Sequence, residues 1–175
     1  MTTTVWFAHG KESGPWGRKI TALARVARER GCAVESPDYR FTQDPDARVE
    51  HLLSLNPDRR GRLVLVGSSM GGYVSAVASR YLSPAGLWLL APAVDMPGYP
   101  ADTGPGADLV EVIHGWSDSL IPYRQVVDWS HRHGARLTLV PAGHTLSEQL
   151  PLLVRRFDAF LAELADDGEP APPDA

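Results

Sequence analysis

Cysteine is nearly absent from this 175-residue sequence: Cys32 is the single example, so no disulfide bond can form within the chain. Such a chain suits a reducing compartment, and we expect a cytoplasmic protein. Long apolar runs are absent too, and none approaches the roughly 20 residues that span a bilayer. The first residues show no basic region followed by an apolar stretch, so we expect no secretory signal and no association with a membrane.

Positive charge is in slight deficit, with 17 Lys and Arg against 21 Asp and Glu and a formal net charge of −4. No basic patch with interleaved aromatic residues occurs, which disfavours nucleic acid as a partner. A G-x-G-x-x-G fingerprint is missing after the first apolar run, which disfavours a Rossmann-type nucleotide site. The remaining composition, 43% hydrophobic and 22% charged, is ordinary for one globular domain with a substantial core.

Short apolar runs alternate with helix-like segments along the chain, a pattern typical of a parallel α/β sheet. We therefore predict an α/β fold with about six parallel strands flanked by helices, in a single domain over residues 1–165. Residues 166–175 are acidic and proline-rich and are predicted to form a disordered tail. The strands are expected near residues 5–8, 32–35, 63–66, 87–90, 109–113 and 136–140, and two of the helices near 15–30 and 122–133.

The most informative stretch is Gly67-Ser68-Ser69-Met70-Gly71, which directly follows the apolar run 63–66. A strand, then G-x-S-x-G, then a helix-like segment is the arrangement of a nucleophile elbow, in which small residues flank a sharply turned serine. The pattern arises by chance about 0.1 times in a chain of this composition, so its context carries the inference. We identify Ser69 as the candidate nucleophile; the plainer interpretation is a glycine-rich turn with an idle serine.

A serine nucleophile needs an adjacent base, and the base needs a group that orients it. In the chain order Ser, Asp, His, the base lies downstream of the nucleophile. His144 directly follows the last predicted strand, so we expect it at the carboxyl edge of the sheet, on the same side as Ser69. His131 and His133 are expected at a solvated helix end, and an H-x-H pair without a third ligand is a weak metal signal.

The acid that orients the base has two candidates, each in a loop after a predicted strand. Asp118 follows the fifth strand and Asp95 follows the fourth. The plainer interpretation of either residue is ordinary turn chemistry, for which aspartate is favoured. We favour Asp118, because the fifth strand is expected to lie beside the strand that leads to His144.

Two backbone N–H groups are predicted to form an oxyanion hole. One belongs to Met70, the residue after the nucleophile, and the other to the loop after the first strand, where Lys11 is the first choice. Trp116 lies two residues before Asp118 and is a candidate for lining the acyl pocket. These motifs imply no metal and no organic cofactor.

Four pieces of the sequence together resemble the α/β-hydrolase superfamily: Ala8-His9-Gly10, the stretch 67–72, the loop 115–122 with Asp118, and Gly143-His144. The chain looks most like the small, lidless, esterase-like branch of that superfamily, and the resemblance extends to about residue 165. The resemblance implies a serine hydrolase with Ser69 as nucleophile, His144 as base and Asp118 as the group that orients the base.

Only residues 94–107 are available between the fourth and fifth strands, which is too short a segment for a helical cap. We therefore expect an open site and a small-molecule substrate, a soluble ester or thioester hydrolysed through an acyl-enzyme intermediate. The alternative is a non-catalytic binding or scaffold protein that keeps the fold. The sequence leaves the oligomeric state open.

Overall fold

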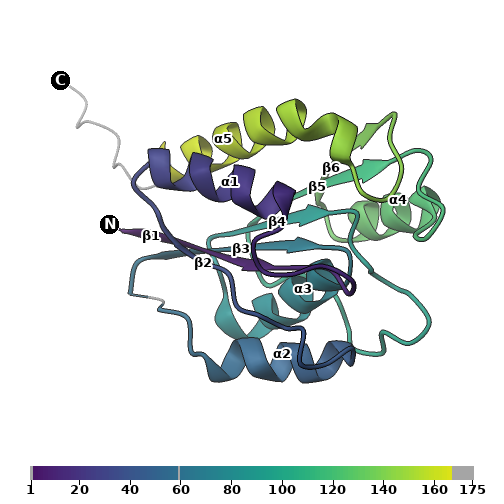
Figure 1. Ribbon diagram of the computed structural model, residues 1–175, viewed down its shortest axis with the longest axis horizontal. Coiled ribbons are helices and arrows are strands. Elements are labelled where there is room, and N and C mark those ends of the chain that lie inside the picture. The colour runs from purple at the N-terminus through teal and green to yellow at the C-terminus, as the bar shows by residue number, and fades with distance from the viewer. Residues whose placement is uncertain (1, 59, 167–175) are drawn as a thin grey trace.

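The structure, a computed structural model, describes residues 2–58 and 60–166. Strands and helices alternate along the chain (Figure 1). The strands are β1 (Thr3–Ala8), β2 (Ala33–Glu35), β3 (Arg62–Ser68), β4 (Gly86–Leu90), β5 (Leu109–Gly115) and β6 (Arg136–Val140). The helices are α1 (Arg18–Glu29), α2 (Pro45–Ser54), α3 (Met70–Leu82), α4 (Tyr123–Arg132) and α5 (Leu150–Asp166), with a 3-10 turn η1 (Ser147–Gln149) before α5. Within these described ranges, no helix has the length and apolar character needed to cross a membrane.

All six strands form one sheet in the order β2-β1-β3-β4-β5-β6, and every neighbouring pair is parallel. The loops that follow the strands therefore open at one edge of the sheet. The chain runs from β1 outward to β2 and then returns to place β3 on the other side of β1. In such sheets ligands bind at the carboxyl edge beside the point where the strand order reverses, here between β1 and β3.

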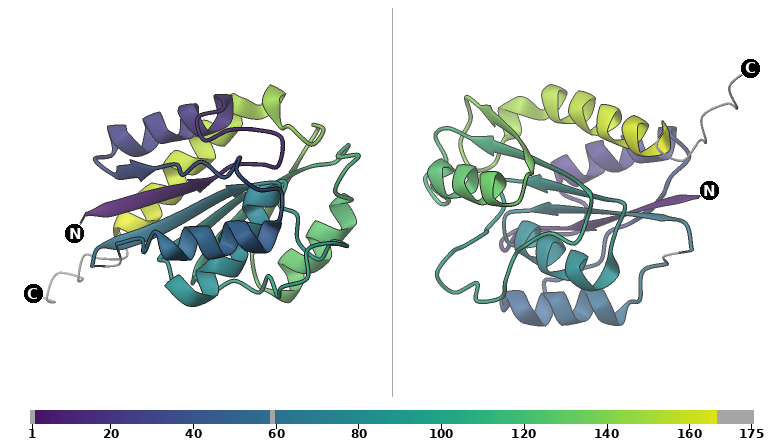
Figure 2. Two further views of the ribbon diagram at one scale, coloured as in Figure 1. Left: turned by 60° about the horizontal axis from the view of Figure 1, so that its bottom comes forward. Right: turned by 180° about the vertical axis from the view of Figure 1, so that it is seen from behind.

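The central strands are apolar along their whole length because helices cover both faces of the sheet. In β3, Val64 and Val66 join the core with α1 and α5, whereas Leu63 and Leu65 join the core with α2, α3 and α4. Figure 2 shows these two groups of helices on opposite sides of the sheet. The continuous apolar run 63–66 is thus the signature of a strand that supplies side chains to both cores.

The predicted α/β architecture with six parallel strands is confirmed, but two predicted helix starts are wrong. Gly17 has an extended backbone with ψ 166°, so α1 begins at Arg18 and not near Pro15. Pro122 has ψ 127° and is the N-cap of α4, so its helix begins one residue later. Of the predicted tail over 166–175, only Asp166 is described, as the last residue of α5; the rest lies outside the described residues.

The connection between β4 and β5 leaves the carboxyl edge of the sheet uncapped. Residues 91–108, all of which are described, contain turns and bends but neither helix nor strand. The expectation that this segment forms no helical cap is therefore confirmed. The connection between β4 and β5 therefore places no cap domain over the edge where the loops after β1 and β3 diverge.

Candidate active site

Ser69 lies in the turn between β3 and α3, with φ 56° and ψ −119°. Positive φ is unfavourable for a residue with a side chain, so the surrounding structure must hold this turn. Two glycines allow the necessary close packing. A Cβ on Gly71 would lie 1.9 Å from the Ala8 carbonyl oxygen, and a Cβ on Gly67 would lie 2.1 Å from the Gly71 carbonyl oxygen. The local sequence therefore forms the strand–serine–helix turn of a nucleophile elbow.

Ser69, His144 and Asp118 form a continuous hydrogen-bonded chain. His144 Nε2 lies 2.9 Å from Ser69 Oγ, and His144 Nδ1 lies 2.7 Å from Asp118 Oδ2. Because a carboxylate only accepts hydrogen bonds, Nδ1 carries the proton and Nε2 is free to accept from the serine hydroxyl. The strands β5 and β6 are neighbours, which brings the loops with Asp118 and His144 together at the edge where Ser69 lies.

The Asp118 carboxylate is fixed by its own loop. Its side chain is 0% exposed, and Oδ1 accepts hydrogen bonds of 2.9 Å from the N–H groups of both Leu120 and Ile121. A second imidazole lies behind it: His114 Nε2 donates to the Ile121 carbonyl at 3.0 Å and lies 3.6 Å from Asp118 Oδ2. Burial lowers the pKa of His114, which favours its neutral form. The second oxygen of Asp118 is thereby left for His144.

The competing residues of the sequence analysis lie elsewhere. Asp95, the alternative acid, forms an ion pair with Arg132 of α4. His133 packs its ring against Trp129 at the end of α4, and His131 is exposed on the same helix. Among the residues that the structure describes, no group of three or more His, Cys, Asp or Glu side chains is arranged to hold a metal ion.

The two amides predicted for the oxyanion hole belong to segments that flank Ser69. Met70 is the first residue of α3, and Lys11 lies in the loop after β1. That loop packs on the elbow, since a Cβ on Gly10 would lie 3.6 Å from Ser69 Cβ. In the described part of the chain, neither the Met70 nor the Lys11 N–H donates to a backbone carbonyl. Both groups are thus available as donors to a ligand; for Met70 this is usual, since the first amides of a helix have no partner within the helix.

Arg48 of α2 holds the loop after β1 in place. Arg48 is 1% exposed, and its guanidinium donates to the carbonyls of His9, Gly10 and Lys11 at 3.3, 3.2 and 3.4 Å. Sequence reasoning missed this residue. Its position four residues before the buried Leu52 was the available signal, because residues at that spacing share one helix face.

A cavity of about 610 Å³ opens over Ser69 and His144. Its wall is built from the loop after β1, the beginning of α1 and the loops after β3, β4, β5 and β6. Its described lining does not include Trp116, which is 50% exposed and packs its ring on Tyr123 at a centroid distance of 5.0 Å. The structure therefore gives the predicted pocket role of Trp116 no support. Lys19 of α1 does line the cavity, and no sequence motif had singled it out.

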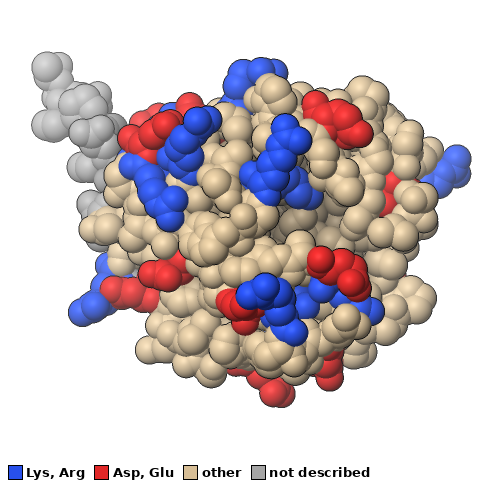
Figure 3. Space-filling view, in the orientation of Figure 1, with Lys and Arg blue, Asp and Glu red and all other residues tan. Residues whose placement is uncertain are grey.

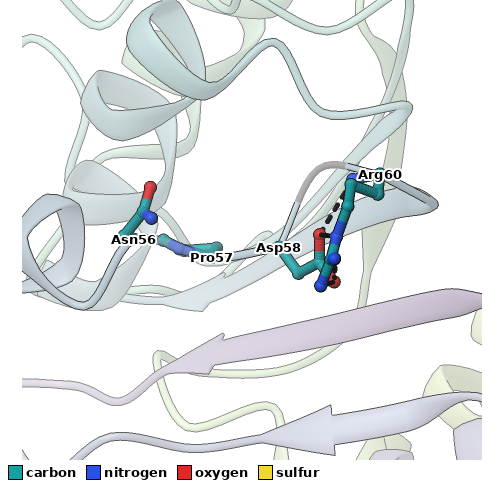
Figure 4. Close-up of a pocket in the computed structure, with 4 residues that line it drawn as sticks. All are labelled: Asn56, Pro57, Asp58 and Arg60. Carbon is teal, nitrogen blue, oxygen red and sulfur yellow. Dashed lines mark hydrogen bonds and ion pairs between the residues drawn. The ribbon is translucent and has the colours of Figure 1, made fainter.

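A second depression lies between α2 and β3 and is lined by Asn56, Pro57, Asp58 and Arg60 (Figure 4). These residues precede β3, so they lie at the amino end of the strand whose carboxyl end carries Ser69. Asp58 and Arg60 form an ion pair with each other at 3.0 Å. The described lining offers neither a nucleophile with a base nor an unpaired charge, so we place the chemistry at the Ser69 cavity.

Comparison with known proteins assigns this fold to a family. The model of an uncharacterised protein family, UPF0227, matches residues 4–99, more than half of the chain. A solved structure from Xanthomonas campestris pv. campestris, described as a "putative hydrolase of the alpha/beta superfamily", is 32% identical, with a TM-score of 0.84 over 93% of this chain and 99% of that chain. The chain belongs to UPF0227, within the α/β-hydrolase superfamily. The match to UPF0227 includes Ser69 and ends before Asp118 and His144.

More distant structures share the fold of this UPF0227 member. Est1E from Butyrivibrio proteoclasticus is 17% identical, with a TM-score of 0.82 over 94% of this chain and 88% of that chain. XC6422 from Xanthomonas campestris, described as an a/b serine hydrolase without lid, is 24% identical, with a TM-score of 0.65 over 98% of this chain and 84% of that chain. A search of curated proteins found no match.

Proposed function

We propose that this UPF0227 protein is a serine hydrolase that cleaves a small soluble ester or thioester through an acyl-enzyme intermediate. The observation that carries the proposal is the hydrogen-bonded chain from Asp118 through His144 to Ser69, with distances of 2.7 and 2.9 Å. A serine hydroxyl becomes a competent nucleophile when an oriented base accepts its proton. The 610 Å³ cavity over Ser69 and His144 provides room for a small substrate beside the hydroxyl.

In the proposed reaction, Ser69 Oγ attacks the carbonyl carbon while its proton moves to His144 Nε2. Asp118 stays ionised and stabilises the imidazolium through the Nδ1–H hydrogen bond. The N–H groups of Met70 and Lys11 stabilise the negative charge that develops on the carbonyl oxygen. His144 then protonates the departing alcohol or thiol. In the second half of the reaction, water attacks the acyl-enzyme while His144 takes its proton, and His144 returns that proton to Ser69 Oγ as the acid product leaves.

The open carboxyl edge favours small, water-soluble substrates. Residues 91–108 supply no cap that would bury a long acyl chain. Two structural neighbours agree with this choice: XC6422 is described as a serine hydrolase without lid, and Est1E has been solved with ferulic acid bound. These neighbours support the proposed substrate class.

The single thiol is a poor competitor to Ser69. Cys32 follows α1 and is half-buried, and burial raises the pKa of its thiol, which disfavours the nucleophilic thiolate. Cys32 lies outside the described lining of the Ser69 cavity. A cytoplasmic location, where such a thiol stays reduced, forms part of the proposal.

Hydrolysis of 4-nitrophenyl acetate and butyrate tests the proposal. Wild-type protein is expected to release 4-nitrophenol, and Ser69→Ala to lower kcat by about 10⁴-fold or more, since loss of a triad member removes most of the acceleration. Ser54→Ala, which removes an exposed hydroxyl at the end of α2, is the matched control and should leave kcat unchanged. Substantial turnover by a folded Ser69→Ala protein would contradict the assignment and favour a different nucleophile.

A further inference from the structure

The proposed mechanism does not use one of the most unusual side chains of the cavity, Lys19. This residue lies in the first turn of α1, and its Nζ donates to Ser68 Oγ at 3.1 Å. Ser68 directly precedes the nucleophile Ser69, so the Lys19 ammonium contacts the residue next to the nucleophile. Lys19 lines the same cavity as Ser69 and His144.

The Lys19 ammonium lacks a countercharge in direct contact. Across residues 2–58 and 60–166, no carboxylate forms an ion pair with it, and its hydrogen-bond acceptor is the neutral Ser68 hydroxyl. Burial lowers the pKa of Lys19 to about 8, with the charge of Asp118 as a smaller opposing influence. Lys19 is half-buried, and withdrawing an ammonium even partly from water without a countercharge is unfavourable. An ammonium kept in this state inside a cavity indicates a function.

The charge of the cavity differs from that of the whole chain. Its described lining contains the cations Lys11, Arg18 and Lys19 but only one acidic side chain, Glu12. The whole chain instead carries a formal charge of −4, and acidic and basic side chains are interspersed over the face shown in Figure 3. A positive cavity in a negative protein attracts negatively charged ligands.

We infer that the substrate carries a carboxylate or a similar anionic group close to the scissile bond, and that Lys19 binds this group. The inference rests on the proposed function, because it names the substrate class of the same site. An incoming carboxylate accepts a charge-assisted hydrogen bond from Lys19 Nζ, while Ser68 Oγ keeps the ammonium directed into the cavity. Lys19 thereby acts as a specificity-determining residue beside the nucleophile.

Matched pairs of esters test the inference. In the first pair, 4-nitrophenyl hydrogen succinate carries the anion on the acyl side, and 4-nitrophenyl butyrate is its neutral counterpart. In the second pair, acetylsalicylate carries the anion on the leaving group, and phenyl acetate is neutral. Lys19→Met removes the ammonium at similar length. Arg25→Met removes a cation from the same helix at a side chain that is 70% exposed, and serves as the control.

Lys19→Met is expected to lower kcat/KM for the anionic ester of at least one pair by about 10- to 100-fold, since a hydrogen bond to a charged group is lost. The neutral ester should change by less than about threefold, and Arg25→Met should affect both members equally. The pair that responds identifies the side of the ester that carries the anion. Equal losses on anionic and neutral esters, or no loss on either, would overturn the inference.

Binding measurements separate failure of this inference from failure of the proposed function. Titration calorimetry of the same four esters is carried out with Ser69→Ala, which lacks the nucleophile, and with Ser69→Ala/Lys19→Met. Tighter binding of an anionic ester than of its neutral counterpart, lost in Ser69→Ala/Lys19→Met, supports the inference. This holds even if the wild-type protein hydrolyses neither ester; the lack of hydrolysis would refute only the proposed function. Binding that is insensitive to Lys19 overturns the inference, whatever the turnover.

Discussion

At the residue scale, the geometry of the candidate triad is set by the hydrogen bonds that each of its side chains accepts or donates. Asp118 accepts from Leu120 and Ile121 through one oxygen and from His144 through the other. These contacts fix the carboxylate before any substrate arrives. The orientation of the His144 ring, and the tautomer with the proton on Nδ1, follow from that arrangement.

Asp118→Asn should lower kcat by about 10³- to 10⁴-fold while the protein stays folded, because an amide at this position favours the wrong tautomer of His144. Asp95→Asn is the matched control, since Asp95 was the competing acid and pairs with Arg132 at the surface. We expect its kcat to equal that of the wild type. Steady-state kinetics of ester hydrolysis, with thermal unfolding as a check of folding, measure both. A larger loss in Asp95→Asn than in Asp118→Asn would reverse the assignment of the acid.

Residues of the site differed in how far the sequence predicted them. Ser69 and His144 were named because a motif and the end of a predicted strand fix where such residues lie, and the structure joins them by a hydrogen bond. Lys19 and Arg48 were not named. Each lies within a helix, where a charged residue normally faces water, and their burial depends on loops distant in sequence. Trp116 was assigned to the pocket by proximity in sequence, which does not determine the direction of a side chain.

At the scale of elements, the loop after β1 depends on α2. Three of its consecutive carbonyls accept from the Arg48 guanidinium, so a helix on one face of the sheet positions a loop at its edge. Arginine suits this task because its guanidinium offers five donors in a rigid plane. The Lys11 amide, proposed for the oxyanion hole, belongs to the same loop.

Arg48→Met should lower the free energy of unfolding by about 2–4 kcal/mol, since buried carbonyls lose their donors. Among molecules that remain folded, kcat should fall more than KM rises, because the displaced loop carries the Lys11 amide that is proposed to stabilise the transition state. Glu50→Gln on the exposed face of α2 should alter neither quantity appreciably. Denaturant unfolding and ester kinetics test both; an unchanged kcat in folded Arg48→Met would show that Arg48 is structural only.

The elements themselves were more predictable than their ends. Alternating apolar runs and helical segments predicted the six parallel strands, because both faces of this sheet are buried and the strands are continuously apolar. Two helix starts were predicted at Pro15 and Pro122, but the helices begin later, at Arg18 and Tyr123. Proline fits the first turn of a helix but equally fits the extended residues before it, and the local sequence does not decide between them.

At the scale of the whole molecule, the sheet topology concentrates the chemistry at one edge. Ser69 follows β3, Asp118 follows β5 and His144 follows β6, so three parallel strands deliver three side chains to the same side. The loop after β1 and the start of α1 complete the cavity beside β3. Without a cap in residues 91–108, this edge stays accessible to small ligands.

Labelling with a fluorophosphonate probe is the most direct test of the central claim that Ser69 is an activated nucleophile. The probe reacts with serines that a base activates and not with ordinary hydroxyls. Intact mass and peptide mapping are expected to show one adduct, on Ser69, that is lost in His144→Ala. Correctly folded wild-type protein that takes up no adduct, or an adduct that persists in His144→Ala, would contradict the account.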